Sequence, residues 1–268
     1  MQIFSILFLL VSFQLKASCE FKKDVTKVTS LSGSMAVTLR ELGLLSSSRM
    51  KGITVFAPIT KDEFKGMSFP GGIFLSQQTL SQFDNEIVFY DEARELHRIL
   101  ASRKSIIARE VRTRNLTPVE AIDSTLEVLK EFVVDCEKEI TQFKNKALNL
   151  EKEILGAIST PLHVIFYIGQ IKNNRLPETI MANDGIVKWL REKNKIVTYP
   201  SDLAYVSWSA KVMQDLEKKT LHVGIKDPGQ KNLKAFSKNN NNISFEYPGS
   251  LVPGLSQLEA FLYLFQKL

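Results

Sequence analysis

The chain has 268 residues, of which 44% are hydrophobic and 24% charged, and its formal net charge is +6. These values are ordinary for a globular protein that buries one large core or two smaller ones. The lysines are scattered among acidic residues and form no basic block interleaved with aromatics. This pattern excludes nucleic acid as an expected partner.

The N-terminus carries an export pattern. Residues 1–13 are almost wholly apolar, residues 14–19 turn small and polar, and no Lys or Arg precedes the apolar run. Such a run is too short to span a bilayer and is typical of a secretory signal followed by a cleavage zone. We therefore predict a signal peptide over residues 1–18 and a periplasmic location. Cleavage before Cys19 would leave a cysteine that can carry a lipid anchor, which is the alternative to a free protein.

The chain has two cysteines, Cys19 and Cys136. Cys136 stands among Val133, Val134 and Ile140, where we expect a small buried thiol. A disulfide between the two cysteines is the alternative, and nothing in the sequence favours it.

Residues 19–116 alternate between strand patterns and helix patterns, as expected for an α/β lobe. Strands are predicted at 25–31, 52–56, 86–90 and 105–110, and helices at 35–42, 77–83 and 92–100. A loop rich in glycine and aromatic residues occupies 67–74.

A long polar helical run follows, and we assign residues 117–159 to a linking helix. It opens with Thr117-Pro118-Val119-Glu120, in which Thr and Glu can form a capping box around a proline at the first helical position. A straight helix from there to residue 155 would be about 60 Å long, more than a small domain is wide. We therefore expect a break near Val133, Val134 and Asp135.

Residues 160–268 repeat the alternation. Strands are predicted at 162–168, 221–225 and 243–247, longer helices at 184–193, 207–218 and 255–268, a short helix after Asp227-Pro228-Gly229, and a polar loop at 239–242. Alternation throughout predicts an α/β protein with two Rossmann-like lobes, whose parallel sheets are joined by the linking helix. Such an arrangement is suited to holding a ligand between the lobes.

In open parallel sheets, ligands bind beyond the carboxyl ends of the strands. The residues at these places are rich in aromatics and poor in charge, which favours an aromatic-walled cleft, although core packing is the plain alternative for any single aromatic. The free amides of Ser32–Ser34 suit a carboxylate, phosphate or amide oxygen. The candidate ligand-binding residues are Ser32, Gly33, Ser34, Phe56, Phe74, Tyr90, Tyr205, Trp208 and Leu251.

Catalytic and metal sites have little support. His97, His163 and His222 are far apart in sequence and belong to no metal-binding motif. The chain also lacks a nucleophile elbow, a phosphate-binding loop and the glycine pattern of dinucleotide-binding folds. We therefore expect no enzyme, no cofactor and no metal site. A metal receptor would require two or more of the histidines to converge.

Several segments resemble the helical-backbone periplasmic binding proteins, the substrate receptors of ABC importers for vitamin B12, siderophores and haem. They are Val28-Thr29-Ser30-Leu31-Ser32-Gly33-Ser34-Met35, Leu42-Gly43-Leu44, Lys51-Gly52-Ile53-Thr54, the stretch 182–190, Tyr205-Val206-Ser207-Trp208 and Pro248-Gly249-Ser250. Their order and spacing resemble the vitamin B12-binding branch most. The resemblance implies two lobes that close only slightly on a ligand, with Phe56, Phe74, Tyr90 and Tyr205 at cleft positions where rings can stack on it.

The resemblance therefore implies a monomeric receptor that captures a corrinoid, siderophore or haem for an ABC permease. The sequence departs from the family in two places, and the first of these departures stands against that function. The family carries one glutamate on each lobe to pair with permease arginines, but the matching positions here read Ser76-Gln77-Gln78 and Ser209-Ala210-Lys211. Gly33 also replaces the usual proline of the first turn. The alternative is a divergent, non-transport member that acts as an interaction or envelope-structural protein.

Overall fold

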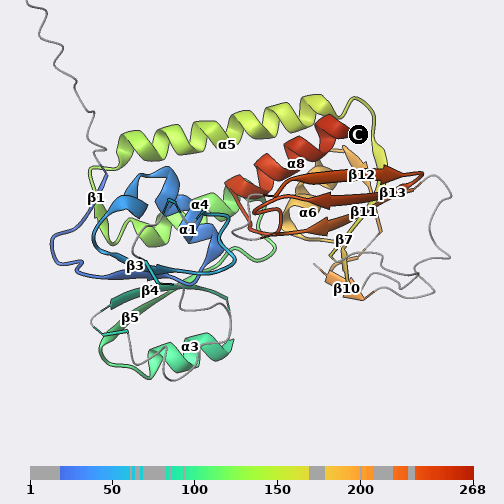
Figure 1. The fold of residues 1–268 in the computed structure, drawn as a ribbon. Helices are drawn as coiled ribbons and strands as arrows, with labels where there is room; N and C mark the ends of the chain where they lie inside the picture. The colour runs from blue at the N-terminus through green and yellow to red at the C-terminus, as the bar shows by residue number, and fades with distance from the viewer. Residues whose placement is uncertain are drawn as a thin grey trace, which may run out of the picture.

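The computed structural model describes residues 19–60, 62–63, 67–68, 83–84, 86–92, 94–168, 179–199, 201–203, 205–207, 220–228 and 233–268 (Figure 1). The predicted signal peptide and most of the helices predicted at 77–83 and 207–218 lie outside these ranges. Across them, no helix is both long enough and apolar enough to cross a membrane.

The N-terminal lobe is built on a four-stranded parallel sheet in the order β3-β2-β4-β5. Its elements are β2 (Val28–Ser30), α1 (Gly33–Glu41), the 3-10 turn η1 (Leu44–Ser46), β3 (Met50–Ile53), β4 (Glu86–Asp91), α3 (Arg94–Ala101) and β5 (Ile106–Val111). Helix α1 lies on one face of the sheet and α3 on the other (Figure 1). The strands and these two helices confirm the predicted alternation.

The two faces of this sheet separate the side chains of β4. Ile87 and Phe89 belong to the main core on the α1 side, whereas Val88 and Tyr90 pack with Leu100 of α3. Because side chains alternate along a strand, the next residue, Asp91, falls on the α1 side. At the end of β4, Tyr90 therefore lies on the α3 side of the sheet and Asp91 on the α1 side.

The linking run is two helices, α4 (Pro118–Leu129) and α5 (Glu137–Ala157), separated by the short strand β6 (Val133–Val134). The Thr117 side chain accepts from the Glu120 amide and the Glu120 carboxylate accepts from the Thr117 amide, which is the expected capping box. The break lies where the β-branched pair stands. Val133–Val134 pairs with β1 (Glu20–Phe21), and Asp135 takes a φ of 55°.

Cys19 and Cys136 form a disulfide beside this β1–β6 pair. The expectation of a free buried thiol at Cys136 is therefore wrong, because the ladder between β1 and β6 brings the two cysteines together. The alternative of a lipid on Cys19 is corrected as well, since its sulfur is already bonded.

The C-terminal lobe contains a mixed sheet in the order β10-β8-β7-β11-β13-β12, with β9 also paired to β7. Its elements are β7 (Leu162–Ile168), β8 (Thr179–Met181), α6 (Gly185–Glu192), β9 (Ile196–Val197), β10 (Tyr205–Ser207), β11 (Leu221–Lys226), β12 (Ala235–Asn239), β13 (Asn242–Glu246) and α8 (Leu255–Lys267). The centre, β7-β11-β13, is parallel as expected. The strands β8, β10 and β12 are antiparallel additions that the sequence did not indicate.

The outer strand β12 explains why this lobe departs from a purely parallel sheet. The polar loop predicted at 239–242 is the turn of a β12–β13 hairpin, and Asn240 has a φ of 51° there. Asparagine tolerates this left-handed conformation, which tight hairpin turns require. β12 is mostly exposed and polar, so it lacks the apolar pattern by which a strand is recognised.

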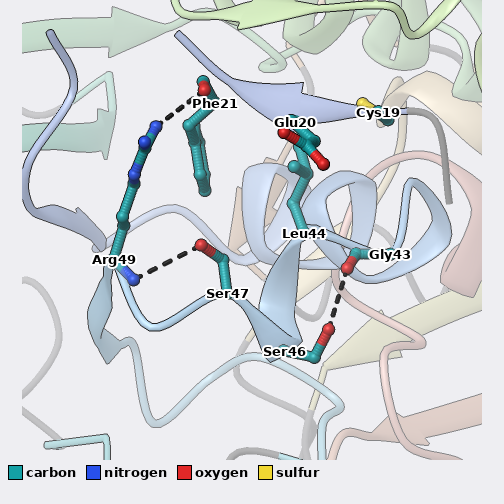
Figure 2. Close-up of a pocket in the computed structure, with 8 residues that line it drawn as sticks. All are labelled: Cys19, Glu20, Phe21, Gly43, Leu44, Ser46, Ser47 and Arg49. Carbon is teal, nitrogen blue, oxygen red and sulfur yellow. Dashed lines mark hydrogen bonds between the residues drawn. The ribbon is translucent and has the colours of Figure 1, made fainter. Parts of the chain in front are cut away.

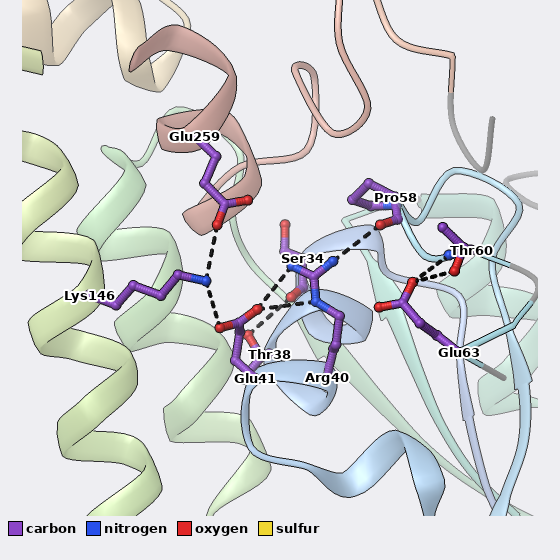
Figure 3. Close-up of polar contacts among 9 residues, drawn as sticks. All are labelled: Ser34, Thr38, Arg40, Glu41, Pro58, Thr60, Glu63, Lys146 and Glu259. Carbon is purple, nitrogen blue, oxygen red and sulfur yellow. Dashed lines mark hydrogen bonds and ion pairs between the residues drawn. The ribbon is translucent and has the colours of Figure 1, made fainter. Parts of the chain in front are cut away.

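Helices α5 and α8 join the lobes (Figure 1). One continuous cluster of buried side chains runs from the N-terminal lobe through α4 and α5 to α8 and the C-terminal sheet. At its edge, Lys146 of α5 bridges Glu41 of α1 and Glu259 of α8, with both N–O distances at 3.0 Å (Figure 3). Nearby, Arg40 donates to the Pro58 carbonyl at 3.2 Å. Three helices from both lobes are therefore tied together on the side of the linker.

Candidate ligand-binding cleft

Two adjoining pockets lie between the lobes, and they share Asp91, Glu92 and Pro253. The first, of about 200 Å³, is lined by Leu31, Gly33, Ser34, Thr54, Phe56, Asp91, Glu92, Leu251, Val252 and Pro253. The second, of about 350 Å³, is lined by Asp91, Glu92, Thr113, Arg114, Asn115, Leu116, Asp184, Gly185, Tyr205, Pro253 and Gln257. The N-terminal wall thus comes from the carboxyl ends of β2, β3, β4 and β5, as expected for a parallel sheet.

The structure brings together five of the predicted site residues. Gly33, Ser34, Phe56 and Leu251 line the first pocket and Tyr205 lines the second. Phe56 is 54% exposed, so its ring is available to a ligand. Phe74 and Trp208 lie outside the described residues, as do the two segments 76–78 and 209–211 matched to permease docking.

Tyr90 does not line either pocket. It is buried on the α3 side of β4, where its hydroxyl lies 2.6 Å from Nδ1 of His97. Burial raises the pKa of the Tyr90 hydroxyl. The residue that follows it, Asp91, reaches the cleft in its place, because one step along a strand changes the face.

Asp91 lies in front of the first turn of α1. Ser32 caps this helix by accepting from the Met35 amide at 3.2 Å, and Ser32 itself is buried and lines neither pocket. Burial raises the pKa of Asp91 to about 6, although the Ser32 hydroxyl and the Gly33 amide favour the ionised form. Its Oδ1 atom is closed off from solvent and has no hydrogen-bond partner among the described residues. The amides predicted to hold a ligand oxygen therefore face the protein's own carboxylate.

Asp184 occupies the equivalent place on the C-terminal wall, at the start of α6. Its Oδ1 accepts from the Ile186 amide at 3.3 Å and from Nε2 of Gln257 at 3.2 Å, and its Oδ2 accepts from the Tyr205 hydroxyl at 2.6 Å. Burial raises the pKa of Asp184, while these three donors oppose the shift. Burial and the neighbouring Asp184 raise the pKa of Tyr205 as well. The network therefore fixes the Tyr205 ring at the cleft wall.

Two glycines allow the lobes to touch at the cleft. A Cβ atom on Gly185 would lie 1.7 Å from the carbonyl oxygen of Leu116, and one on Gly33 would lie 3.2 Å from Cγ2 of Val252. Gly185 and Val252 belong to the C-terminal lobe, whereas Leu116 and Gly33 lie on the opposite side. Helix α6 can thus approach the other wall only because Gly185 has no side chain, whereas a Cβ on Gly33 would make a tight contact with a side chain that can move.

A further pocket of about 280 Å³ lies beside β1 and the disulfide and shares no residue with the cleft (Figure 2). Its one arginine, Arg49, donates from Nη1 to the carbonyls of Phe21 and Lys22, both at 2.6 Å. The guanidinium therefore holds the N-terminal segment in place, which is a structural role.

The histidines do not gather at the cleft. His97 pairs with Tyr90, while His163 and His222 stand at the beginnings of β7 and β11, the strand ends away from the cleft. Over the described ranges, no three side chains of His, Cys, Asp or Glu come together as a metal site.

The comparisons with known proteins concern the fold. A possible iron-binding (periplasmic solute-binding) protein from Staphylococcus epidermidis aligns with a TM-score of 0.63 and 16% identity, over 91% of this chain and 98% of that chain. The periplasmic haem-binding protein HutB of Vibrio cholerae aligns with a TM-score of 0.61 and 11% identity, over 90% and 98%. The periplasmic vitamin B12-binding protein BtuF of Vibrio cholerae gives 0.60 and 11%, over 91% and 98%.

The chain has the fold of these binding proteins. No protein-family model and no curated protein matches the sequence. The predicted α/β architecture with two lobes and a helical connection is therefore confirmed by the structure and by its neighbours.

Proposed function

We propose that this protein is an exported, periplasmic substrate-binding protein that captures a ligand in the cleft between its lobes for ABC-type uptake. The observation that carries the proposal is the pair of adjoining pockets at the carboxyl ends of the N-terminal strands, closed on the other side by Tyr205 and the loop 251–253. Ligands of open α/β sheets bind at this end of the strands. Binding needs no covalent chemistry, and we propose no enzymatic activity.

The compartment and the ligand class have separate support. A disulfide that ties the N-terminal segment to the linker suits an oxidising compartment such as the periplasm. The structural neighbours bind haem or vitamin B12, or are ferric-siderophore receptors, so these classes are the first ligands to test. We propose a monomer that delivers its ligand to a permease, through contacts other than the paired glutamates. The alternative of an envelope-structural protein rests on the two matched positions that lack the docking glutamates, and nothing in the described residues adds to it.

The test is a thermal-shift screen of the mature protein against cobalamin, cobinamide, haem, several ferric siderophores and Zn²⁺. A ligand present at 100 times its dissociation constant stabilises the folded state by about 2.7 kcal/mol, which raises the melting temperature visibly. We expect a shift with one ligand class.

Two variants connect any shift to the cleft. Phe56→Ala removes a 54% exposed ring from the first pocket, whereas Val197→Ala removes a 49% exposed side chain from β9, outside the cleft. The shift should shrink in the first variant and persist in the second. A folded sample that shows no shift with any probe would contradict the proposal and support the non-transport alternative.

A further inference from the structure

We propose that the ligand presents an N–H donor or a positive charge to Asp91, so that the cleft selects amide- or ammonium-bearing ligands over polyanions. This inference rests on the proposed function. The shared chemistry occurs in the amide side chains of corrinoids and in the free ammonium group of a hydroxamate siderophore such as ferrioxamine B.

A helix N-terminus ordinarily attracts an anion, because its first amides are free and its dipole is positive there. Here the Asp91 carboxylate already lies beside Ser32 and Gly33, the residues that open the helix. An anionic ligand group at this place would be repelled by the Asp91 carboxylate. The start of α1 therefore favours a cationic or N–H-donating group, whereas a free helix N-terminus would favour an anion.

Buried polar atoms in proteins nearly always have a hydrogen-bond partner, and an exception calls for an explanation. In the part of the chain that the structure describes, Oδ1 of Asp91 has none, and the charged neighbour that shifts the pKa of Asp91 is another acid, Glu92, which raises it. Within the described part of the chain, no cation is among the groups that shift the pKa of this carboxylate. Asp91 is partly exposed and lines both pockets, so a ligand can reach the carboxylate from either. Because Oδ1 is closed off from solvent in the ligand-free protein, the side chain must rotate for Oδ1 to meet the ligand.

The charged residues that line the two pockets, in the described part of the chain, are Asp91, Glu92, Asp184 and Arg114. Arg114 stands in the second pocket only, near Tyr205. A surplus of carboxylates disfavours the propionates of haem and the catecholate oxygens of ferric enterobactin. It favours N–H donors, whose hydrogen bonds to an ionised acceptor are the strong kind.

The test compares four probes at near-neutral pH and low salt: dicyanocobinamide, ferrioxamine B, haem and ferric enterobactin. Binding to the mature protein is measured by titration calorimetry for the wild type, for Asp91→Asn and for the matched control Asp84→Asn. Asp84 is exposed and distant from both pockets. We expect the wild type to bind one of the first two probes and to prefer it to the anionic pair.

Asp91→Asn removes the charge while keeping the shape of the side chain. We expect it to weaken binding about tenfold or more for an ammonium probe and about threefold to tenfold for an amide probe. Asp84→Asn should leave both affinities unchanged. The size of the loss, together with the probe that binds, separates the two sources of N–H donors.

A second readout guards against a purely structural role. Because Asn relieves an uncompensated buried charge, ligand-free Asp91→Asn should melt at the same temperature as the wild type or higher. A lower melting temperature would assign Asp91 to the support of α1 and overturn the inference. An unchanged affinity in Asp91→Asn, or tighter wild-type binding of haem or ferric enterobactin, would overturn it while the proposed function stands. Binding of none of the four probes would overturn the inference, whereas the proposed function would be overturned only if the wider thermal-shift screen also showed no binding.

Discussion

The two helices that begin at the cleft, α1 on the N-terminal wall and α6 on the C-terminal wall, are alike in outline and opposite in chemistry. Each starts with a glycine behind a capping residue, and each has an aspartate at its first turn. Asp184 caps its own helix and has three donors, whereas Asp91 comes from β4 and has one oxygen without a partner among the residues that the structure describes. The same side chain is thus committed to structure on one wall and available to a ligand on the other.

The largest difference in stability between the two helix starts is expected when their first glycines are replaced. In Gly185→Ala the new Cβ would overlap the backbone carbonyl of Leu116, which cannot turn aside, so the lobes must shift. We expect the free energy of unfolding to fall by about 3 kcal/mol, at the upper end for overpacking. Urea unfolding followed by circular dichroism measures it.

Gly33→Ala is the matched control for this substitution. Its Cβ would meet only the side chain of Val252 at 3.2 Å, which can give by a small movement. We expect a loss below about 1 kcal/mol. Equal losses in the two variants would show that the lobes do not touch more closely at α6 than at α1.

The second largest effect is expected at Asp184, the aspartate that has a structural role on the C-terminal wall. Asp184→Ala removes the cap of α6 and leaves the Tyr205 hydroxyl and the Gln257 amide without their acceptor. Loss of a cap and of buried hydrogen bonds should lower the free energy of unfolding by about 2 kcal/mol, measured by urea denaturation. Asp91→Ala should cost clearly less. If Asp91→Ala costs as much, the contrast between the two walls is wrong.

The third effect is a pH dependence on the other wall. Burial raises the pKa of Asp91 from 3.8 to about 6, so the folded state holds this proton more tightly than the unfolded chain. The stability that Asp91 contributes is therefore fully present below about pH 4 and is lost as the pH rises through 6. Allowing for its partial exposure, we expect the unfolding free energy of the wild type, relative to Asp91→Asn, to fall by about 1–2 kcal/mol over this window.

This difference is measured by urea unfolding of both proteins from pH 4 to 7. Glu86 and Asp184, whose pKa values burial also raises, are present in both proteins, so their contributions cancel. Glu92, Arg114 and Tyr205, the other charged or titratable groups of the cleft, are retained as well. A difference that is flat with pH would mean that Asp91 titrates normally and that its charge is compensated.

The features that were predicted correctly depend on residues that are close to one another along the chain. The capping box at Thr117, the break at Val133–Val134 and the strands of the N-terminal sheet follow from local patterns, and the structure has all of them. The disulfide could not be predicted, because its cysteines are 117 residues apart and meet only through the β1–β6 ladder. The antiparallel strands were missed because they are short and several are exposed.

In the candidate site, local sequence could not show which of two consecutive residues, Tyr90 or Asp91, lies at the cleft. All of 86–90 is buried, so no alternation of polar and apolar residues indicates which face Tyr90 occupies. The rule that ligands bind after the strands pointed to the right end of β4, and the next residue, Asp91, was the one that reached the cleft. Asp184 and Gln257 needed the folded lobe, since they meet Tyr205 only there.

The smallest effect is expected from Tyr205→Phe. The hydroxyl donates to Oδ2 of Asp184 at 2.6 Å, and its removal leaves that oxygen without the donor. We expect a loss of about 1 kcal/mol in unfolding free energy and a further rise in the pKa of Asp184, because a hydrogen bond that favours the ionised form is gone. The ring, 37% exposed at the cleft wall, remains.

Ligand affinity then separates the two roles of Tyr205. If the ring contacts the ligand and the hydroxyl only holds Asp184, Tyr205→Phe should bind the ligand nearly as the wild type does, whereas Tyr205→Ala should bind it more weakly. Titration calorimetry on both variants decides this. A strong loss of affinity in Tyr205→Phe would mean that the Asp184 network takes part in binding, and that the C-terminal wall is not purely structural.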